Sequence, residues 1–372
     1  MTRIRSALGL GAVTAAITFA LIAPPAHAAE PGTPVAPVPQ LAQSTNGGTN
    51  PTVGDVPATE VLGRPDPGVV PVVGDAAARA DSGARVLYES QVDDRIVDLM
   101  ISSPALGGNS PVRLLLPEDF DRSSGRTWPV LYLLPGASER ADYQSWSIYT
   151  DVLSWLGQED VVVAMPSLGA TGLGTNWNNG GRGARGGFQW DDYLSDELPQ
   201  LLSRGYAAAD RRSVAGVSTG GFSAFALVAH NPGRYGAAAS FSGLNALGAS
   251  YPLVQALLLR EGVSPTAPWG SRWLNFLQWE RADPSNHPSA LRQSRLFLSN
   301  GNGRKSLLDP TAADWDAFEA STLANNTAFV SGMTLRGVTL RTDFYGDGSH
   351  SWPYWARSLE RAWPELSAGL GR

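Results

Sequence analysis

The feature that most constrains the fold is an alternation of short apolar runs with amphipathic stretches over residues 129–366. The apolar runs are rich in β-branched residues and lack polar alternation, which is typical of strands buried on both faces. Strands are predicted at residues 129–134, 161–165, 213–217, 237–241, 296–298 and 340–345. Helices are predicted at residues 145–157, 191–204, 220–230, 310–331 and 352–366. This order predicts an α/β domain with a mostly parallel central sheet and helices on both faces, with an antiparallel pair near 95–101 and 112–116 at one edge.

The N-terminus has the three parts of a secretory signal peptide. Arg3 and Arg5 precede an apolar stretch over residues 7–23, and an Ala-His-Ala sequence ends at Ala28. This pattern predicts export and cleavage after Ala28, so residues 1–28 are expected to be a signal peptide. The alternative is an uncleaved membrane anchor, but the stretch is short for a bilayer span.

A spacer is expected to separate the signal peptide from the folded domain. Residues 29–83 are rich in Pro, Gly, Ala, Thr and Val and have few aromatic residues. Such a segment buries too little apolar area to offset the entropy of ordering it, so it is expected to be disordered. The catalytic domain is accordingly assigned to residues 84–372.

Composition and charge exclude several classes of function. The net charge of −6 argues against nucleic-acid binding, which needs a concentrated basic surface. The chain has no Cys, which removes disulfides, thiolate metal sites and a cysteine nucleophile. The four His residues (His27, His230, His287 and His350) are widely separated and form no zinc motif. We therefore expect neither a metal nor an organic cofactor.

The strongest chemical signal is the sequence Gly-Val-Ser-Thr-Gly-Gly over residues 216–221. It follows a predicted strand and opens a predicted helix, which is the setting of a nucleophile elbow with Ser218 as the nucleophile. Glycines on both sides allow a strained turn that would otherwise collide with the neighbouring strand and helix. The alternative interpretation is a glycine-rich turn with a capping serine.

A serine hydroxyl needs a base to become a nucleophile. His350 follows the last predicted strand in a loop, where the chain order serine, acid, histidine would place it. His230 is expected to lie at a helix end beside an Asn-Pro stop, and His287 in a polar surface turn. The orienting acid should follow the strand near 295–299, and spacing alone leaves four candidates. They are Asp309, Asp314, Asp316 and Glu319.

An oxyanion hole requires two backbone N–H donors. One is expected from Thr219, the residue after the nucleophile, and the other from the loop that follows an early strand. In that loop, Gly136 permits a turn that exposes the N–H of Ala137.

Together these segments resemble the secreted actinobacterial esterase family that includes the antigen-85 type mycolyltransferases. The matching sequences are YLLPGA at 132–137, SDELP at 195–199, GVSTGG at 216–221, SNGNG at 299–303 and HSWPYW at 350–355. The resemblance covers nearly all of residues 90–366 and implies the α/β-hydrolase fold. It also implies that the acid is a Glu about thirty residues before the His, which selects Glu319 over Asp309.

Two positions depart from the mycolyltransferase pattern. Where those enzymes carry an Asp before the loop glycine and an Arg two residues after it, this chain has Pro135 and Ser138. The departures argue against trehalose recognition and favour a plainer carboxylesterase.

The resemblance implies a secreted or cell-envelope serine esterase or acyltransferase that acts on acyl esters or lipids through an acyl-enzyme. Carboxylic ester hydrolysis is the expected reaction. One alternative is mycolyltransferase-like transfer to trehalose or an envelope glycolipid. Another is a non-catalytic envelope-binding protein on a hydrolase scaffold.

Three other features suggest roles near the site. The Gly- and Asn-rich segment 169–190 is interpreted either as a wall of the substrate pocket or as a flexible surface loop. Trp269, Trp273 and Trp279 fit core packing slightly better than an acyl-binding wall. The acidic residues around Asp191 fit the first turn of a helix, where carboxylates favour the dipole.

Overall fold

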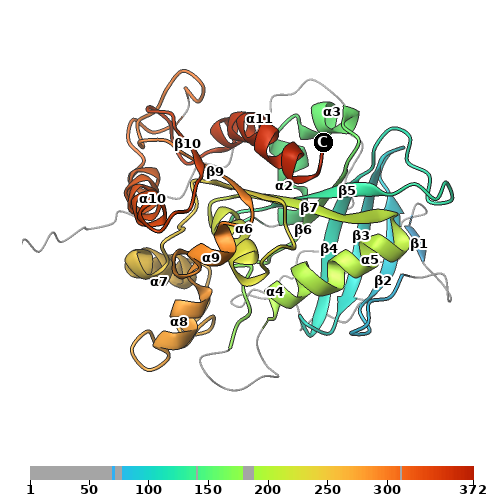
Figure 1. Cartoon of the computed structure of the whole chain (residues 1–372), viewed down its shortest axis with the longest axis horizontal. Helices are drawn as coiled ribbons and strands as arrows, with labels where there is room; N and C mark the ends of the chain where they lie inside the picture. Colours follow the sequence, from blue (N-terminus) through green and yellow to red (C-terminus); the bar gives the residue numbers. More distant parts are fainter. Residues whose placement is uncertain (1–68, 72–77, 140, 179–187, 311) are drawn as a thin grey trace, which may run out of the picture. The chain divides into compact units, whose positions relative to one another are not determined.

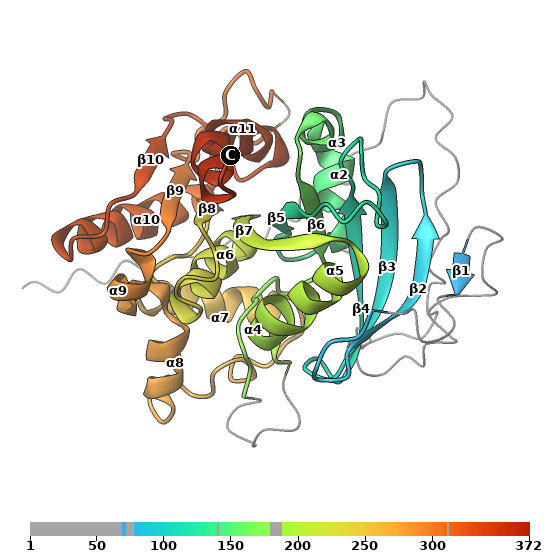
Figure 2. The same ribbon diagram turned by 45° about the vertical axis from the view of Figure 1, so that its right-hand side comes forward.

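The computed structural model describes residues 69–71, 78–139, 141–178, 188–310 and 312–372. Within these ranges, ten strands form one sheet in the order β1-β2-β3-β4-β6-β5-β7-β8-β9-β10. The strands are β1 (Val69–Pro71), β2 (Arg85–Gln91), β3 (Ile96–Ser103), β4 (Gly108–Leu115), β5 (Trp128–Leu134), β6 (Val162–Pro166), β7 (Ala208–Val217), β8 (Ala237–Phe241), β9 (Arg295–Asn300) and β10 (Arg341–Phe344). The order of the strands is the one visible in Figures 1 and 2.

The sheet has an antiparallel part and a parallel part. Pairing is antiparallel from β1 through β4 and across β4–β6. From β6 through β5, β7, β8 and β9 to β10 every pairing is parallel. The carboxyl ends of the parallel strands therefore lie along one edge, where α/β proteins usually place their functional residues.

The helices lie on both faces of this sheet. They are α2 (Ser145–Tyr149), α3 (Val152–Trp155), α4 (Trp190–Asp192), α5 (Leu198–Gly205), α6 (Thr219–His230), α7 (Tyr251–Arg260), α8 (Phe276–Ala282), α9 (Pro288–Leu291), α10 (Ala317–Leu335) and α11 (Trp352–Gly369). Helices α5 and α6 cover one face, and α2, α3 and α11 cover the other (Figure 2).

Strand β5 shows why its sequence is continuously apolar. Val130, Tyr132 and Leu134 pack into the core on the α6 face, while Leu131 and Leu133 pack into the core beneath α11. A strand that contributes to two cores has no polar face. The predicted α/β-hydrolase architecture is confirmed.

Two predicted helices differ from the observed ones. The helix expected at 145–157 is interrupted at Thr150, whose hydroxyl bonds to the Trp146 carbonyl and accepts from the Val152 N–H. Such local side-chain bonds compete with helix continuation. The helix expected from residue 310 begins only at Ala317, because the Asp316 carboxylate caps the N–H groups of Phe318 and Glu319.

The prediction of a disordered spacer over residues 29–83 is wrong at the C-terminal end of this range. Strand β1 pairs with β2 in the register Val69 to Ser90. Ala80 is 4% exposed, and the Ser82 hydroxyl donates to Glu197 Oε1 at 2.7 Å. Residues 78–83 thus belong to the folded unit, although their composition is that of a linker.

The predicted signal peptide over residues 1–28, and the first part of the predicted spacer, lie outside the described residues. Within the described ranges, no helix combines the length and the apolar character that a membrane span requires.

Candidate active site

Ser218 occupies a strained turn between β7 and α6. Its backbone has φ 54° and ψ −123°, a conformation that side-chain-bearing residues rarely adopt. The flanking glycines are required sterically. A Cβ on Gly216 would lie 2.2 Å from the Gly220 carbonyl oxygen, and a Cβ on Gly220 would lie 2.2 Å from the Pro135 carbonyl oxygen. The turn therefore has the geometry expected of a nucleophile elbow.

The loop after β5, residues 135–138, lies directly against this turn. We call it the oxyanion loop, after the role predicted for Ala137. A Cβ on Gly136 would be 3.4 Å from the Ser218 Cβ, so this loop approaches the serine closely. Ala137 is the next residue of the loop. Thr219 is the first residue of α6, where the helix leaves the backbone N–H without an intrahelical partner. Both predicted oxyanion donors thus belong to segments that adjoin Ser218.

Glu319 and His350 are joined by a buried hydrogen bond. Glu319 lies in the first turn of α10 with 0% of its surface exposed, and its Oε2 lies 2.7 Å from His350 Nδ1. His350 lies in the loop between β10 and α11, with 14% of its side chain exposed. Thirty-one positions separate these two residues, and the fold brings them together.

The second oxygen of Glu319 is fixed at the carboxyl edge of the sheet. Its Oε1 accepts from the Ser242 hydroxyl at 2.9 Å, the Asn300 amide at 2.8 Å and the Gly301 N–H at 2.7 Å. Ser242 follows β8, Asn300 ends β9 and Gly301 comes directly after it. In the sheet, β8 lies beside β7 and β9 lies beside β8. A buried carboxylate needs such donors to offset its loss of water. Ser242 and Asn300 were not identified from sequence as site residues, although Asn300 lies in the quoted SNGNG motif.

His350 is also held by two aromatic rings and through its backbone. The rings of Phe318 and Trp355 contact it edge-on at centroid distances of 4.7 and 4.9 Å. The His350 N–H donates to Asp316 Oδ2 at 2.8 Å. Among the described residues, His350 Nε2 has no hydrogen-bond partner, so no hydrogen bond joins it to the Ser218 hydroxyl.

The other three candidate acids have different contacts. Asp316 caps α10 and holds the His350 backbone. Asp309 accepts from the Ser351 hydroxyl at 2.7 Å, and Asp314 pairs with Lys305 at 2.6 Å on the surface. Of the four, Glu319 is the one that contacts the imidazole.

A polar cluster borders the oxyanion loop where the sequence departs from the mycolyltransferase pattern. Ser138 has φ 72°, and its hydroxyl donates to Glu261 Oε1 at 2.5 Å. The same hydroxyl accepts from Arg260 Nη2 at 2.5 Å, and Arg260 Nε pairs with Glu261 at 2.9 Å. The end of α7 therefore brings a guanidinium to this loop from a different part of the chain.

Two carboxyl groups beside the oxyanion loop have strongly raised pKa values. Burial raises the pKa of Glu139 to about 8, and the nearby Asp142 carboxyl adds to this shift. Burial likewise raises the pKa of Asp142 to about 6, although Asp142 accepts from the Leu168 N–H at 2.7 Å. The side chain of Trp352, two positions after His350, offsets part of this shift. With a pKa of about 8, Glu139 favours its protonated form at neutral pH.

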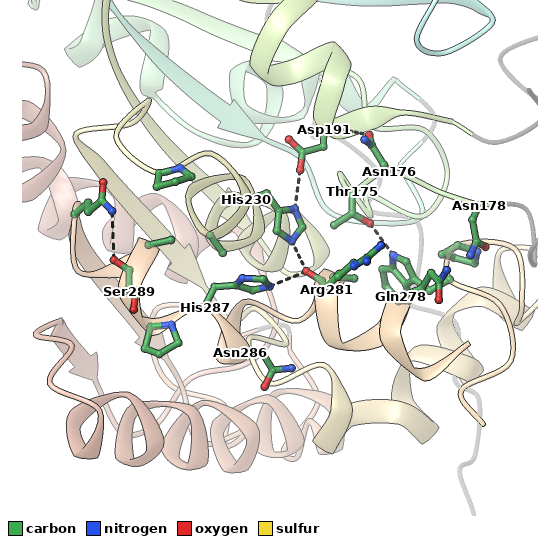
Figure 3. Close-up of a pocket in the computed structure, with 18 residues that line it drawn as sticks. Thr175, Asn176, Asn178, Asp191, His230, Gln278, Arg281, Asn286, His287 and Ser289 are labelled. Atoms are coloured by element: carbon green, nitrogen blue, oxygen red, sulfur yellow. Dashed lines mark hydrogen bonds and ion pairs between the residues drawn. The ribbon is translucent and has the colours of Figure 1, made fainter. Parts of the chain in front are cut away.

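A separate cavity of about 830 Å³ lies between α6 and the α8–α9 segment and contains neither Ser218 nor His350. Figure 3 shows His230 between Asp191 and the backbone of Arg281, with His287 directed at the same carbonyl. His230 Nδ1 lies 2.6 Å from Asp191 Oδ2, and Nε2 lies 2.6 Å from the Arg281 oxygen. Both ring nitrogens of His230 are therefore engaged.

This arrangement changes the interpretation of His230 and Asp191. Asp191 does lie in the first turn of a helix, as expected, but it also accepts from the Asn231 amide at 2.6 Å. The Asn231 side chain and His230 therefore converge on one buried carboxylate. The contact spans 39 positions and ties α4 to the end of α6.

Within the described ranges, no group of three or more His, Asp or Glu residues is arranged to hold a metal ion. The described residues thus include a serine in a strained turn and a carboxylate-bound imidazole.

Comparison with known proteins finds mycolyltransferases among the relatives of this chain. The chain is 29% identical over 285 residues to "Diacylglycerol acyltransferase/mycolyltransferase Ag85A" of Mycobacterium gordonae, covering 73% of this chain and 80% of that protein. It is 28% identical over 320 residues to the Ag85B protein of Mycobacterium intracellulare, covering 82% and 90%.

Solved structures agree with this result. The crystal structure of Mycobacterium tuberculosis MPT51 (FbpC1) matches with a TM-score of 0.60 and 25% identity, covering 73% of this chain and 97% of that one. An S-formylglutathione hydrolase from Agrobacterium tumefaciens matches in fold with a TM-score of 0.57 and 14% identity, covering 77% and 99%. The resemblance found in the sequence is thereby confirmed.

The family model described as "Putative esterase" matches residues 103–366, from the end of β3 into α11. This match spans the elbow, the oxyanion loop and the Glu319–His350 pair, and covers well over half of the chain. The protein belongs to this esterase family, whose chemistry is the hydrolysis or transfer of acyl esters.

Proposed function

We propose that this chain is an exported serine carboxylesterase in which Ser218 is the nucleophile, His350 the general base and then acid, and Glu319 the orienting carboxylate. The observation that carries the proposal is the buried hydrogen bond between Glu319 and His350, 2.7 Å long, at the sheet edge where Ser218 occupies its strained turn. A carboxylate on Nδ1 leaves Nε2 as the nitrogen that can accept a proton.

The reaction follows from this arrangement. The Ser218 hydroxyl oxygen attacks the ester carbonyl carbon while its proton passes to His350 Nε2. The N–H groups of Ala137 and Thr219 bind the oxyanion of the tetrahedral intermediate. The intermediate collapses, the alcohol leaves with the proton from Nε2, and an acyl-enzyme remains. A water molecule then repeats the sequence and releases the acid.

The arrangement of Glu319 supports the role of an orienting group. Three donors fix one of its oxygens, so the other is held toward Nδ1 and stabilises the imidazolium as it forms. The free Nε2 is compatible with this mechanism, because catalytic hydrogen bonds often tighten only when substrate binds.

A second candidate function is acyl transfer to a sugar hydroxyl, as the names of the mycolyltransferase relatives suggest. The observation that favours it is the Arg260 guanidinium at Ser138, beside the oxyanion loop. A guanidinium there could bind a polyhydroxylated acceptor such as trehalose or an envelope glycolipid. The third candidate, a non-catalytic envelope-binding protein, is disfavoured by the intact set of Ser218, Glu319 and His350.

The test uses the protein as exported by its expression host, with its N-terminus determined by mass spectrometry and the Ser218→Ala variant as control. Short- and long-chain acyl esters are incubated with and without trehalose, and the products are identified by mass spectrometry. Free acid that is unaffected by trehalose and absent with Ser218→Ala supports the esterase. Acylated trehalose formed at the expense of free acid identifies an acyltransferase. Turnover that survives in Ser218→Ala contradicts the assigned nucleophile.

A further inference from the structure

A short segment before and at the start of α8 exposes large apolar side chains. Trp273 is 84% exposed, Leu274 86%, Phe276 56% and Leu277 54%. The two other tryptophans of this region, Trp269 and Trp279, are only 2% and 3% exposed, and their rings contact each other at 4.9 Å. The interpretation of these tryptophans as core residues is therefore right for two of the three. We call residues 273–277 the apolar loop. Figure 1 shows α8, which begins within it, well away from the central sheet.

The apolar loop is not the only exposed apolar segment. Among the described residues, most large exposed apolar side chains belong to the connections that follow β5, β8 or β9 along the chain. They are Ile148, Tyr149, Leu259, Trp273, Leu274, Phe276, Leu277, Leu307, Leu308 and Trp315. Leu335, at the far end of α10, also belongs to the connection after β9. Outside these connections only Val92 and Phe344 are comparably exposed in the described ranges.

Two of these side chains are linked to the proposed catalytic loops. Tyr149 stacks on Trp352 at 5.3 Å, two residues after His350. Leu259 precedes Arg260, which binds the oxyanion loop at Ser138. The apolar loop itself lies next to Tyr251, at the end of α7 opposite to Arg260. A group of exposed apolar side chains of this kind indicates an interaction surface.

The nearby charges favour one kind of partner. Arg272 precedes the apolar loop and makes no ion pair with the described part of the chain; its guanidinium lies over the Tyr251 ring at 5.2 Å. Exposed Arg304 likewise precedes Leu307, whereas its neighbour Lys305 pairs with Asp314. Cations next to tryptophan and leucine match a lipid–water interface, where phosphates lie beside acyl chains.

We propose that the apolar loop inserts into the surface of a lipid layer and anchors the protein there. The proposal rests on the proposed function, because an esterase that acts on long acyl chains must reach substrates that are packed in lipid. Trp273 would lie at the level of the headgroups, Leu274 and Phe276 among the acyl chains, and Arg272 at a phosphate. A second copy of this chain fits less well, since a five-residue loop falls short of the roughly 800 Å² that each partner of a stable dimer buries.

The absence of cysteine makes a direct test available. A single cysteine is introduced by Leu274→Cys and labelled with the environment-sensitive fluorophore NBD. The matched control is Leu335→Cys, because Leu335 is 89% exposed at the far end of α10. It lies about 24 Å along that helix from Glu319, at 1.5 Å per residue. Vesicles of phosphatidylcholine, with and without phosphatidylglycerol, are added to each labelled protein as exported.

Insertion predicts a blue shift and an intensity increase at position 274 and none at 335, with the larger response on the anionic vesicles. An equal response at both positions, or none at 274, overturns the proposal. The readout needs no catalysis, so it also distinguishes failure of lipid docking from failure of the proposed esterase.

A second measurement connects docking to turnover. The double variant Leu274→Ser/Phe276→Ser changes exposed side chains and is expected to fold, with Leu335→Ser as its control. We expect vesicle binding to fall about fivefold or more, and hydrolysis of a long-chain ester held in vesicles to fall with it. Hydrolysis of a short, water-soluble ester should stay within about twofold. Vesicle binding that is unchanged in the double variant would refute lipid docking. So would a dimer of the wild type in analytical ultracentrifugation that the double variant abolishes, if the wild type shows no response to vesicles.

Discussion

The substitution Glu319→Gln tests the role of the buried carboxylate most directly. Glutamine has nearly the same shape, so the site keeps its packing, but it carries no charge and one of its two terminal atoms becomes a donor. The Glu319 side chain is completely buried, with Ser242, Asn300 and Gly301 donating to Oε1 and His350 Nδ1 at 2.7 Å from Oε2.

These contacts determine how the amide must orient. Three donors require an oxygen at the Oε1 position, so the NH₂ group is directed at His350. The imidazole must then accept at Nδ1 and carry its proton on Nε2, which is the wrong tautomer for removing the Ser218 proton. In serine enzymes, an amide in place of the triad acid lowers kcat about 10⁴-fold, which corresponds to roughly 5.4 kcal/mol.

We therefore expect Glu319→Gln to reduce kcat for p-nitrophenyl butyrate by about 10³- to 10⁴-fold with little change in thermal stability. The matched control is Asp309→Asn, which changes a carboxylate bonded to Ser351 and should retain activity within a few fold. Circular dichroism melting curves verify that both variants fold. If Glu319→Gln remains within tenfold of the wild type while Asp309→Asn loses activity, the assignment of Glu319 as the orienting acid is wrong.

Three further predictions concern the elbow, the raised pKa of Glu139 and the hydrogen bond between Asp191 and His230. Gly220→Ala places a methyl group 2.2 Å from a backbone oxygen and should lower both Tm and ester turnover. Its control, Gly332→Ala, adds a methyl group in open space within α10 and should raise stability by about 0.5–1 kcal/mol. Equal shifts of Tm in the two variants would contradict the steric argument. The pKa of Glu139 is raised from 4.5 to about 8, so the folded state binds the carboxyl proton more tightly than the unfolded state does. The free energy of unfolding therefore falls as the pH rises from about 4.5 to about 8. Glu139→Gln should accordingly raise Tm relative to the wild type at pH above about 8 and change it little near pH 4, and a pH-independent difference in melting scans would refute this. Asp191→Asn removes the anion beside His230 and should cost about 1–3 kcal/mol in urea denaturation. Ester turnover should stay within about twofold, and its loss would place this pair in the catalytic machinery.

The exposed apolar loop shows how far sequence pattern can mislead. Trp269, Trp273 and Trp279 have a loosely helical spacing that predicts a common environment, yet Trp273 is exposed while the other two are buried. The helix of this region begins only at Phe276, so Trp273 precedes it and has no shared face with Trp279. Periodicity gives burial only where the element that carries it is continuous.

The sequence alone determined the features that depend on local sterics and local patterning. The elbow could be predicted because the strained turn at Ser218 needs a glycine at both position 216 and position 220. The sheet could be predicted because each buried strand is apolar along its whole length. The alternation of these strands with helices was then enough to predict the architecture.

Only the tertiary structure decided which distant groups meet. The spacing of four acids after β9 did not distinguish Glu319 from Asp309; the resemblance to known esterases favoured Glu319, and the fold places it against His350. The supports of Glu319 at the ends of β8 and β9, and the pairing of Asp191 with His230, likewise join residues separated by tens of positions. Such contacts depend on which strands are neighbours and how the helices cross them, and no local preference of the chain encodes that arrangement.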